Sequence, residues 1–546
     1  MDSLRIIPIE QKVCEIQKKA LFFRIIQALV SSALLLTNLK MAILNDILSF
    51  FIKRRIERIE EFLRHPIDTQ HRVFHDLIEN ARYTEWGLKY DYNSIDTIKD
   101  FQERVPISTY EELFPYIERV LRGEQNILWA SDIKWFSKSS GTTNSRSKFI
   151  PVSDESLEDC HYRGGKDMMT LYFNNRPESK LFEGKGLSIG GALHANPYNI
   201  ETQAGDISAV ITKNLPAWAD FIRTPPSEVA LLDNWEQKME QMIRICSQEN
   251  VTSILGVPTW TVILLENMLE QSGKKNMLEI WSNFEVFVHG AVAFQPYRDL
   301  FRNKLFPSDQ VTYLETYNAS EGFFAIQDEL GRVGEMLLML DYGIFYEFIP
   351  MEEWEKEHPK MLTLEEVEID KNYALVISTN AGLWRYKIGD TIKFTSLNPY
   401  RIKVSGRTKH FINAFGEEVV IENADAAITE ACAVANAIMT DYTAGPIYMG
   451  DGSKGCHEWI IECAEKPENE ETFIKVLDET LRKVNSDYDA KRYKDMALLL
   501  PKVHFVENGT FYHWMSKRGK LGGQNKVPRL SNSREFLDDI LLMING

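Results

Sequence analysis

Hydrophobic positions in the first quarter of the chain recur at helical spacing. The apolar residues of the first such segment are Ile52, Ile56, Ile59 and Leu63, with charged residues between them. This spacing predicts an amphipathic helix, because residues three and four apart share one helix face. The stretch 41–130 is mostly of this kind and includes a charged helix near Glu111 to Arg122. The residues expected to break it are Pro66, Pro106 and Pro115.

After about residue 135 the pattern changes to short β-like runs that end near serine or glycine. These runs are Trp135-Phe136, Leu187 to Ile189, Ser253 to Leu255 and Val286 to Val288. Helical stretches separate them, for example Trp235 to Ile245 and Thr261 to Gln271. Strands that alternate with helices predict an α/β fold, in which ligands bind at loops following the strands.

A more antiparallel pattern follows, and then a second compact α/β pattern. The antiparallel runs are Gly334 to Leu340, Phe345 to Ile349, Tyr373 to Ser378 and Lys403-Val404. The later elements are a helix over Ile421 to Ala437, strands near Pro446 to Met449, Trp459 to Cys463 and Val503 to Phe505, and a helix that ends near Val484. We therefore predict a large domain over 41–405 and a small domain over 406–546.

Composition and charge narrow the class of protein. Of 546 residues, 44% are hydrophobic and 26% charged, as in ordinary folded proteins. The 62 Lys and Arg against 79 Asp and Glu give a net charge of −17. An acidic surface repels phosphate backbones, so we expect no nucleic-acid partner, although a local loop can still bind a small anion. The six cysteines form no C-x-x-C pair, which predicts reduced thiols and a cytoplasmic location.

The most apolar stretch, Ala20 to Leu39, raises the question of a membrane. It contains Arg24 and Gln27, whereas a spanning helix needs about 20 mostly apolar residues. No small-residue cleavage site of the kind that follows a signal peptide comes after it. We therefore expect no membrane partner, with an anchor or secretion signal as the alternative, and we interpret residues 1–40 as an N-terminal extension.

The sharpest local motif is a run of small hydroxyl residues around one glycine that ends in two cations. Its residues are Ser139, Ser140, Gly141, Thr142, Thr143, Asn144, Ser145, Arg146, Ser147 and Lys148. Backbone N–H groups of such a turn can form a nest for an anion, hydroxyls add donors, and Lys148 or Arg146 adds charge. The Walker A pattern is absent, and a plain surface loop is the alternative.

A second motif, Tyr317 to Gly322, follows an apolar run. A strand that ends in an aromatic ring and a carboxylate offers a face for a purine and an oxygen ligand for Mg²⁺, which prefers one or two carboxylates plus substrate phosphates. Tyr317 and Glu321 are candidates for these roles. The alternative is the start of a surface helix capped by Ser320 or Asn318.

A third motif, Gly382 to Asp390, ends in a glycine and an acidic residue. Asp390 can accept hydrogen bonds from two ribose hydroxyls, and Arg385 can meet a phosphate or a carboxylate. A plain turn with an Arg385–Asp390 surface pair is the alternative.

Two cationic segments complete the set. Arg407 lies at the predicted junction between the domains, and the glycine-rich tail Lys517 to Arg529 carries five cations. Such a tail is usually a solvated segment, but in a chain of net charge −17 it also suggests a local anionic partner.

The order and spacing of these motifs resemble those of the auxin-responsive, Gretchen-Hagen-type acyl acid amido synthetases, a branch of the adenylate-forming superfamily. The matching segments, within residues 41–546, are Ser139 to Thr143 with Lys148 to Pro151, Gly256 to Trp260, His289 to Ala291, Tyr317 to Gly322, Arg385 to Asp390 and Gly523 to Arg529. The resemblance implies the adenylate-forming fold: a large N-terminal α/β domain with a β-rich part, and a small mobile C-terminal α/β domain that closes over ATP about a hinge near Arg407.

The resemblance also implies a reaction in two halves. A carboxylic acid attacks the α-phosphate of Mg·ATP to give an acyl-adenylate and pyrophosphate. The amine of an amino acid then attacks the acyl carbon, which gives an amide and AMP. The expected cofactors are therefore ATP and Mg²⁺, and the expected partners are a small carboxylic acid and an amino acid.

The nucleotide-binding roles that the resemblance implies fall on ten residues. They are Ser139, Ser140, Gly141, Thr142, Thr143, Lys148, Tyr317, Ser320, Asp390 and Arg407. The loop hydroxyls would bind the pyrophosphate end and Tyr317 the adenine. Asp390 would bind the ribose hydroxyls, and Arg407 the ribose or the hinge.

Two catalytic roles are implied as well. Glu321 would hold Mg²⁺. Lys526, delivered by the small domain, would meet the α-phosphate and the developing acyl oxygen, with Lys520 as the alternative lysine. The acyl pocket is expected between the Val257 to Trp260 turn, the Ala291 to Phe294 segment and the N-terminal helices.

Two other functions stay open at the level of the sequence. An acyl-CoA ligase would use the same first half-reaction and then admit a pantetheine thiol. A non-catalytic nucleotide or acid sensor would keep only the fold, but the presence of Glu321, Asp390 and Lys526 argues against it.

Overall fold

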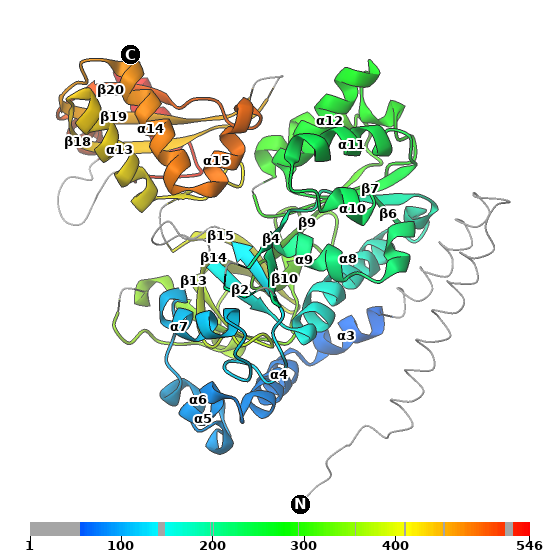
Figure 1. Cartoon of the computed structure of the whole chain (residues 1–546). Coiled ribbons are helices and arrows are strands. Elements are labelled where there is room, and N and C mark those ends of the chain that lie inside the picture. Colours follow the sequence, from blue (N-terminus) through cyan, green and yellow to red (C-terminus); the bar gives the residue numbers. More distant parts are fainter. Residues whose placement is uncertain are drawn as a thin grey trace, which may run out of the picture.

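The protein has a large body and a smaller lobe. A computed structural model describes residues 55–139, 148–196, 198–199, 201–292, 294–354, 356–408, 411–450, 454–518 and 528–545. Figure 1 shows that the elements from α13 (Ile421–Ala435) onward gather in a lobe beside the body formed by the preceding elements.

The body begins with helices. They are α3 (Ile56–Arg64), α4 (Pro66–Ala81), α5 (Glu85–Lys89), α6 (Ile98–Arg104) and α7 (Tyr110–Leu121). Ile59 and Phe62 are the buried residues of α3, and Ile56 and Leu63 are partly buried against the same core, so the predicted amphipathic helix is confirmed from Ile56 onward. Pro66 occupies the first position of α4, where its missing N–H breaks no helical hydrogen bond, so the expected break between α3 and α4 is confirmed.

Pro115 does not break its helix, and the prediction that it would is wrong. It lies inside α7, whose first turn is closed by a capping box between Thr109 and Glu112. An internal proline removes one backbone hydrogen bond. The helix persists because Leu113 and Ile117 on its inner face are fully buried in the core.

An eleven-stranded sheet organises the described part of the body. Its order is β12-β13-β14-β15-β11-β10-β9-β8-β7-β3-β6. The strands are β3 (Lys185–Ser188), β6 (Arg223–Thr224), β7 (Val251–Leu255), β8 (Val286–His289), β9 (Thr312–Ala319), β10 (Gly322–Ile326), β11 (Met336–Leu338), β12 (Ile344–Pro350), β13 (Asn372–Thr379), β14 (Tyr386–Leu397) and β15 (Tyr400–Arg407).

The sheet changes from parallel to antiparallel at β9. Strands β6, β3, β7, β8 and β9 are parallel neighbours, whereas every pairing from β9–β10 to β12–β13 is antiparallel. The carboxyl ends of β3, β7, β8 and β9 therefore lie at one edge. The predicted β-like runs and the antiparallel region are confirmed, and so is the α/β class.

Helices between the strands form part of the body (Figure 1). They are α8 (Tyr162–Asn175), α9 (Ile207–Asn214), α10 (Ser227–Ala230), α11 (Trp235–Cys246) and α12 (Pro258–Ser272). A second sheet has the order β2-β1-β5-β4, with strands β1 (Trp135–Ser139), β2 (Lys148–Val152), β4 (Leu193–Ala195) and β5 (Gln203–Gly205).

The smaller lobe packs helices on a sheet of order β18-β19-β20. Its strands are β18 (Ile438–Ile447), β19 (Cys456–Glu465) and β20 (Lys502–Glu507), and its other helices are α14 (Glu470–Val484), α15 (Ser486–Arg492), α16 (Thr510–Lys517) and α17 (Glu535–Asn545). A short ribbon of β16 (Phe411–Ile412) and β17 (Val419–Val420) precedes α13. The strand predicted at 446–449 begins earlier, at Ile438. Its length is set by its pairing with β19 and not by the short apolar run at its carboxyl end.

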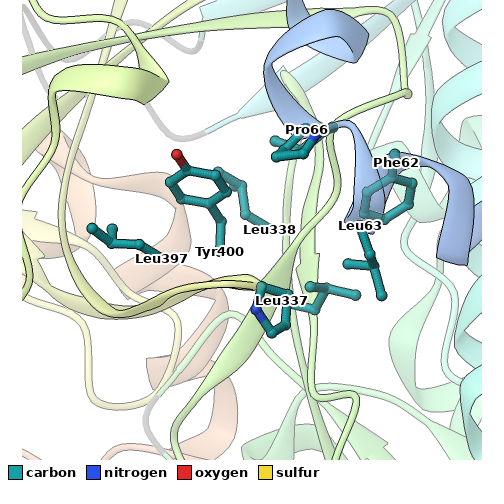
Figure 2. Close-up of a pocket in the computed structure, with 9 residues that line it drawn as sticks. Phe62, Leu63, Pro66, Leu337, Leu338, Leu397 and Tyr400 are labelled. Carbon is teal, nitrogen blue, oxygen red and sulfur yellow. The ribbon is translucent and has the colours of Figure 1, made fainter.

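A small apolar hollow lies where α3 and α4 meet the sheet (Figure 2). Its lining includes Phe62 and Leu63 of α3, Pro66, Leu337 of β11 and Tyr400 of β15. Its volume of ≈ 10 Å³ is about what one water molecule needs, and an apolar lining offers water no partner. No predicted site residue lines it, so we interpret it as a packing defect.

Two further expectations can be compared with the described residues. The cysteines among them are all free, namely Cys160, Cys246, Cys432, Cys456 and Cys463. Within the same part of the chain, no helix combines the length and the apolar character that crossing a membrane requires.

Arg385 is a structural residue and not a ligand of the site. Its Nε and Nη2 donate to the two carboxylate oxygens of Glu347, each at 3.0 Å, and its Nη1 donates to the carbonyl oxygens of Gln102 and Val105 at 2.9 and 2.6 Å. The side chains of Arg385 and Glu347 are only 3% and 1% exposed. The predicted surface pair with Asp390 is therefore wrong, and the carboxylate that Arg385 meets is that of Glu347 in the core.

We predict that Arg385→Met strongly destabilises the body, because it leaves the Glu347 carboxylate buried without its cation. Removing one partner of a buried ion pair costs about 3–5 kcal/mol. Urea unfolding followed by tryptophan fluorescence measures the change. Arg332→Met is the control: it removes an exposed pair with Glu329 (2.7 Å) and should leave the midpoint unchanged. Equal midpoints in the two variants would contradict this account.

Candidate active site

The end of β9 turns directly into β10. Ala319 pairs with Gly322, so Ser320 and Glu321 form the tip of a β-hairpin. The alternative of a surface helix start is therefore wrong. Gly322 is closely packed, because a Cβ there would lie 2.7 Å from the Cδ1 atom of Ile344, which would have to shift. The hairpin presents Ser320 and Glu321 at the edge where the parallel strands end.

Asp390 joins three strands at this edge. The Tyr317 hydroxyl of β9 donates to Asp390 Oδ2 at 2.6 Å, and Arg407 Nε of β15 lies 2.8 Å from Asp390 Oδ1. The β14–β15 register places Asp390 opposite Arg407. A carboxylate offers about four lone-pair positions, so Asp390 can accept further hydrogen bonds.

Burial strengthens this connection. Tyr317 and Asp390 are 8% and 7% exposed. Burial and the neighbouring Asp390 carboxylate raise the pKa of the Tyr317 hydroxyl well above its ordinary value, so it remains a donor. Arg407 also pairs with Glu418, and its charge is thereby shared between two carboxylates.

Glu321 and Lys148 form the second part of the site. Burial raises the pKa of Glu321, and the nearby cation of Lys148 opposes this rise. Lys148 Nζ lies 3.4 Å from the Tyr386 hydroxyl and 5.5 Å from the centroid of the Tyr110 ring. The structure thus brings Lys148, on a different sheet, close to the end of β9.

Tyr386 and Tyr110 were not predicted as site residues. Tyr386 is fully buried, and Tyr110 accepts a hydrogen bond from the Phe149 backbone N–H at 2.8 Å. Tyr386 belongs to the Gly382 to Asp390 motif, so its position in that motif was the sequence signal that could have marked it as a site residue. Nothing local marks Tyr110, because only tertiary packing brings α7 to β2.

The hydroxyl-rich loop is anchored at a defined place. Ser139 at the end of β1 pairs with Lys148 at the start of β2. The described residues therefore show where the loop leaves and returns, beside Lys148. The other predicted residues of the loop and tail, namely Ser140, Gly141, Thr142, Thr143, Lys520 and Lys526, lie outside the described residues.

His289 marks the end of the neighbouring strand β8. Its ring stacks on Phe294 with centroids 4.0 Å apart, and burial lowers its pKa to about 3. Its Nδ1 has no hydrogen-bond partner among the described residues. A neutral imidazole therefore lies against Phe294, the last residue of one segment predicted to line the acyl pocket.

The carboxylate chemistry of the site suits one divalent cation bound together with phosphates. No group of three or more His, Cys, Asp or Glu in the described part of the chain could hold a metal ion. Mg²⁺ bound through a nucleotide usually takes only one or two protein carboxylates. Glu321, whose raised pKa reflects burial that the cations of Lys148 and Arg407 offset only in part, fits that requirement.

Comparison with known families decides the class of this site. The model of the GH3 family N-terminal domain matches residues 55–311, that of the central domain 337–407 and that of the C-terminal domain 422–535. The chain belongs to the GH3 family. The resemblance inferred from its motifs is confirmed. Glu321 lies between the first two matched segments, and Asp390 and Arg407 lie within the second.

Individual GH3 proteins are similar along most of the chain. The indole-3-acetic acid-amido synthetase GH3.3 of Arabidopsis thaliana is 23% identical over 544 residues, which is 86% of this chain and 90% of the relative. The 4-substituted benzoates-glutamate ligase GH3.12 of the same plant is 23% identical over 550 residues, 86% of this chain and 93% of the relative.

Solved structures share the fold. The acyl acid amido synthetase AtGH3.15 in complex with 2,4-DB aligns with a TM-score of 0.59 at 18% identity, over 90% of this chain and 96% of its own. A 2-hydroxyisobutyryl-CoA ligase with 2-HIB-AMP and CoA aligns with a TM-score of 0.51 at 12% identity, over 88% and 91%. This GH3 chain therefore has the adenylate-forming fold that its motifs predicted.

We predict that Glu321→Gln stabilises the protein at neutral pH. Because the folded pKa of Glu321 lies above its usual 4.5, the ionised carboxylate lowers stability, and this loss develops as the pH rises from 4.5 through the folded pKa. The neutral amide avoids the loss, so the gain should vanish as the pH falls below 4.5. Thermal unfolding midpoints measured across pH give the result.

The matched control is Glu103→Gln. The side chain of Glu103 is 68% exposed, so its midpoint difference should stay small at every pH. A pH-independent gain in Glu321→Gln would contradict the inference that the burial of charge is the cause.

Proposed function

We propose that this GH3 protein is an ATP-dependent acyl acid amido synthetase. It would activate a carboxylic acid as an acyl-adenylate and transfer the acyl group to the amine of an amino acid. The observation that carries the proposal is the joining of Tyr317, Asp390 and Arg407 beside Glu321 and Lys148, at the carboxyl end of β9. The amido synthetases and ligases among its relatives support the same chemistry.

The first half-reaction brings the negatively charged phosphates of ATP and the carboxylate of the acid close together. We propose that the Tyr317 ring contacts the adenine and that Asp390 accepts hydrogen bonds from the ribose hydroxyls, with Arg407 holding Asp390 in place. Fixed donors and cations stabilise a phosphoryl displacement without covalent catalysis. Ser320 would add a hydroxyl at the tip of the hairpin.

The pyrophosphate end is assigned to the hydroxyl-rich loop. Ser139, Ser140, Gly141, Thr142 and Thr143 would donate to phosphate oxygens. Lys148, at the return of the loop, would supply the neighbouring positive charge. The position of Ser139 opposite Lys148 supports this assignment.

Glu321 is proposed to hold Mg²⁺. When bound, the ion would neutralise phosphate charge during the displacement. A carboxylate whose pKa is raised by burial gains most from such a cation, which supports the choice of Glu321.

The smaller lobe is proposed to supply the catalytic lysine. Lys526, with Lys520 as the alternative, would meet the α-phosphate and the developing acyl oxygen. We propose a body over 41–405, a mobile lobe over 406–546 and an N-terminal extension over 1–40. Arg407, which ends β15, would be close to the hinge.

A cytoplasmic location and small-molecule partners complete the proposal. The described cysteines are free, as a reducing compartment requires. The net charge of −17 disfavours nucleic acid as a partner. ATP and Mg²⁺, a carboxylic acid and an amino acid are the molecules that we expect the protein to bind.

The acyl-CoA ligase function is the second candidate, because a CoA ligase shares the fold. The two functions differ in the group that consumes the adenylate, a thiol or an amine. A non-catalytic sensor would release no pyrophosphate at all.

We predict pyrophosphate release that depends on both Mg·ATP and an acid. The full-length protein is incubated with aryl, indole and fatty acids, each with and without pooled amino acids, and the products are identified by mass spectrometry. An amide should appear only when an amino acid is present. A thioester formed with CoA, with amino acids ignored, would contradict the amido synthetase.

We predict that Lys526→Ala lowers the rate of adenylate formation by about 10²–10³-fold, because one charged donor to the transition state is lost. The affinity for ATP should change little, since the remaining contacts hold the nucleotide. Acid-dependent ATP–pyrophosphate exchange measures the rate. Lys520→Ala is the matched control in the same tail, and the reverse pattern would move the catalytic role to Lys520.

A further inference from the structure

Contacts between described residues join the smaller lobe to the body. The Tyr297 hydroxyl donates to the carbonyl oxygen of Ala414 at 2.8 Å. Lys494, just after α15, pairs with Glu236 of α11. Apolar side chains from both parts also form one buried cluster. The lobe is therefore seated on the body near α11 and α12.

Lys491 of α15 lies at this junction. Its Nζ is 4.4 Å from the centroid of the Trp260 ring, which belongs to the first turn of α12. A cation over the face of a tryptophan is attracted by the ring quadrupole, so the contact orients the ammonium. We name the pair of Lys491 and Trp260 the lobe seam.

Among the residues that the structure describes, the buried Lys491 ammonium has no acceptor. The residue is 7% exposed, and among the described residues its Nζ forms no hydrogen bond or ion pair besides the ring contact. The next residue differs, since Arg492 makes a two-point ion pair with Asp478 at 2.6 and 3.0 Å. Buried charges in proteins are normally paired, so an unpaired ammonium points to a missing partner.

Nearby carboxylates do not fill that place. Burial lowers the pKa of Lys491, and the more distant charges of Asp487, Glu417 and Asp206 oppose this without pairing with it. Glu417 is already used, because it accepts from the Phe415 backbone N–H at 2.6 Å and lies 2.8 Å from His457 Nε2. The missing partner is thus an anion from outside these groups.

The seam lies on the same edge as the nucleotide residues. Trp260 follows the carboxyl end of β7, and β8 separates β7 from β9, which carries Tyr317 near its carboxyl end and leads to Glu321. Neighbouring strands are about 4.8 Å apart, so the two strand ends are separated by roughly 10 Å. A span of that size can hold the acyl group and its acceptor between the nucleotide and Lys491.

We propose that Lys491 binds the carboxylate of the acceptor amino acid and so selects amino acids over other amines, with Trp260 holding the ammonium in place. The inference rests on the proposed function and deepens it by naming a specificity-determining residue.

The chemistry of the second half-reaction fits this role. A neutral amine attacks the acyl carbon and forms a C–N bond, while the bond from that carbon to the phosphate oxygen breaks. AMP leaves with the electron pair, and the amine nitrogen releases one proton to water. The carboxylate of the acceptor is unchanged throughout. Pairing with it therefore acts on the ground state and the transition state alike, and its loss should raise KM rather than lower kcat.

The test compares two acceptors in the full-length protein. One is the amino acid that gives an amide with the wild type, and the other is its α-carboxamide, which lacks the negative charge. Lys491→Met keeps an unbranched apolar side chain against Gly416, whose added Cβ would lie 3.4 Å from Lys491 Cε. We expect KM for the amino acid to rise about 30-fold or more, as for loss of a buried charge pair. KM for the carboxamide and acid-dependent pyrophosphate exchange should stay the same.

Lys494→Met is the matched control, because it removes another cation at the same junction. It should leave the KM values for both acceptors within about threefold of those of the wild type, as expected for an exposed pair. An equal rise in KM for the amino acid in Lys491→Met and Lys494→Met would overturn the inference in favour of a structural role. In Lys491→Met, an equal rise in KM for the amino acid and for its carboxamide, or a loss of pyrophosphate exchange, would overturn it as well. A wild type that forms no amide refutes the proposed function itself, which separates the two failures.

Discussion

The structure depends on strand β9, where the large sheet changes direction. On one side β9 is parallel to β8, so its end joins an edge of strand ends where polar loops collect. On the other side it folds back into β10, which commits the next strands to antiparallel pairing. Because β9 belongs to both halves, its last residues contact β14 and β15 through Asp390 and also face the parallel edge. A shift of one residue in β9 would move Tyr317 to the opposite face.

The buried ionisable side chains of this protein fall into two groups, those with an ion-pair partner and those without one among the described residues. Arg385 and Glu347 form a buried pair in which all three guanidinium nitrogens and both carboxylate oxygens are hydrogen-bonded, and this pair supports the sheet. Glu321 and His289 lie where the strands end, and Lys491 of α15 lies against Trp260; burial shifts the pKa of each of the three toward its neutral form. Uncompensated polar groups lower stability, and enzymes commonly accept that loss at sites where substrate supplies the missing partner.

The division into a body and a lobe explains why these groups belong to different parts of the chain. The body supplies the cluster of Tyr317, Asp390 and Arg407 from neighbouring strands, which we propose binds the nucleotide. The lobe brings Lys491 against Trp260. If the lobe moves between the two half-reactions, the seam forms and breaks with it, and acceptor binding becomes linked to the position of the lobe.

The sequence by itself determined the α/β class, the strands that precede the glycines and the motifs around Tyr317, Asp390 and Arg407, because periodicity and turn residues are local signals. Its order of motifs was also enough to identify the family. Only the tertiary structure decided that Arg385 is structural, that Pro115 stays within a helix, and that Lys148 meets Tyr386, 238 positions away. The same holds for Lys491 on Trp260. Such contacts depend on strand order, register and the seating of the lobe, and no local pattern in the chain records which distant side chains those will bring together.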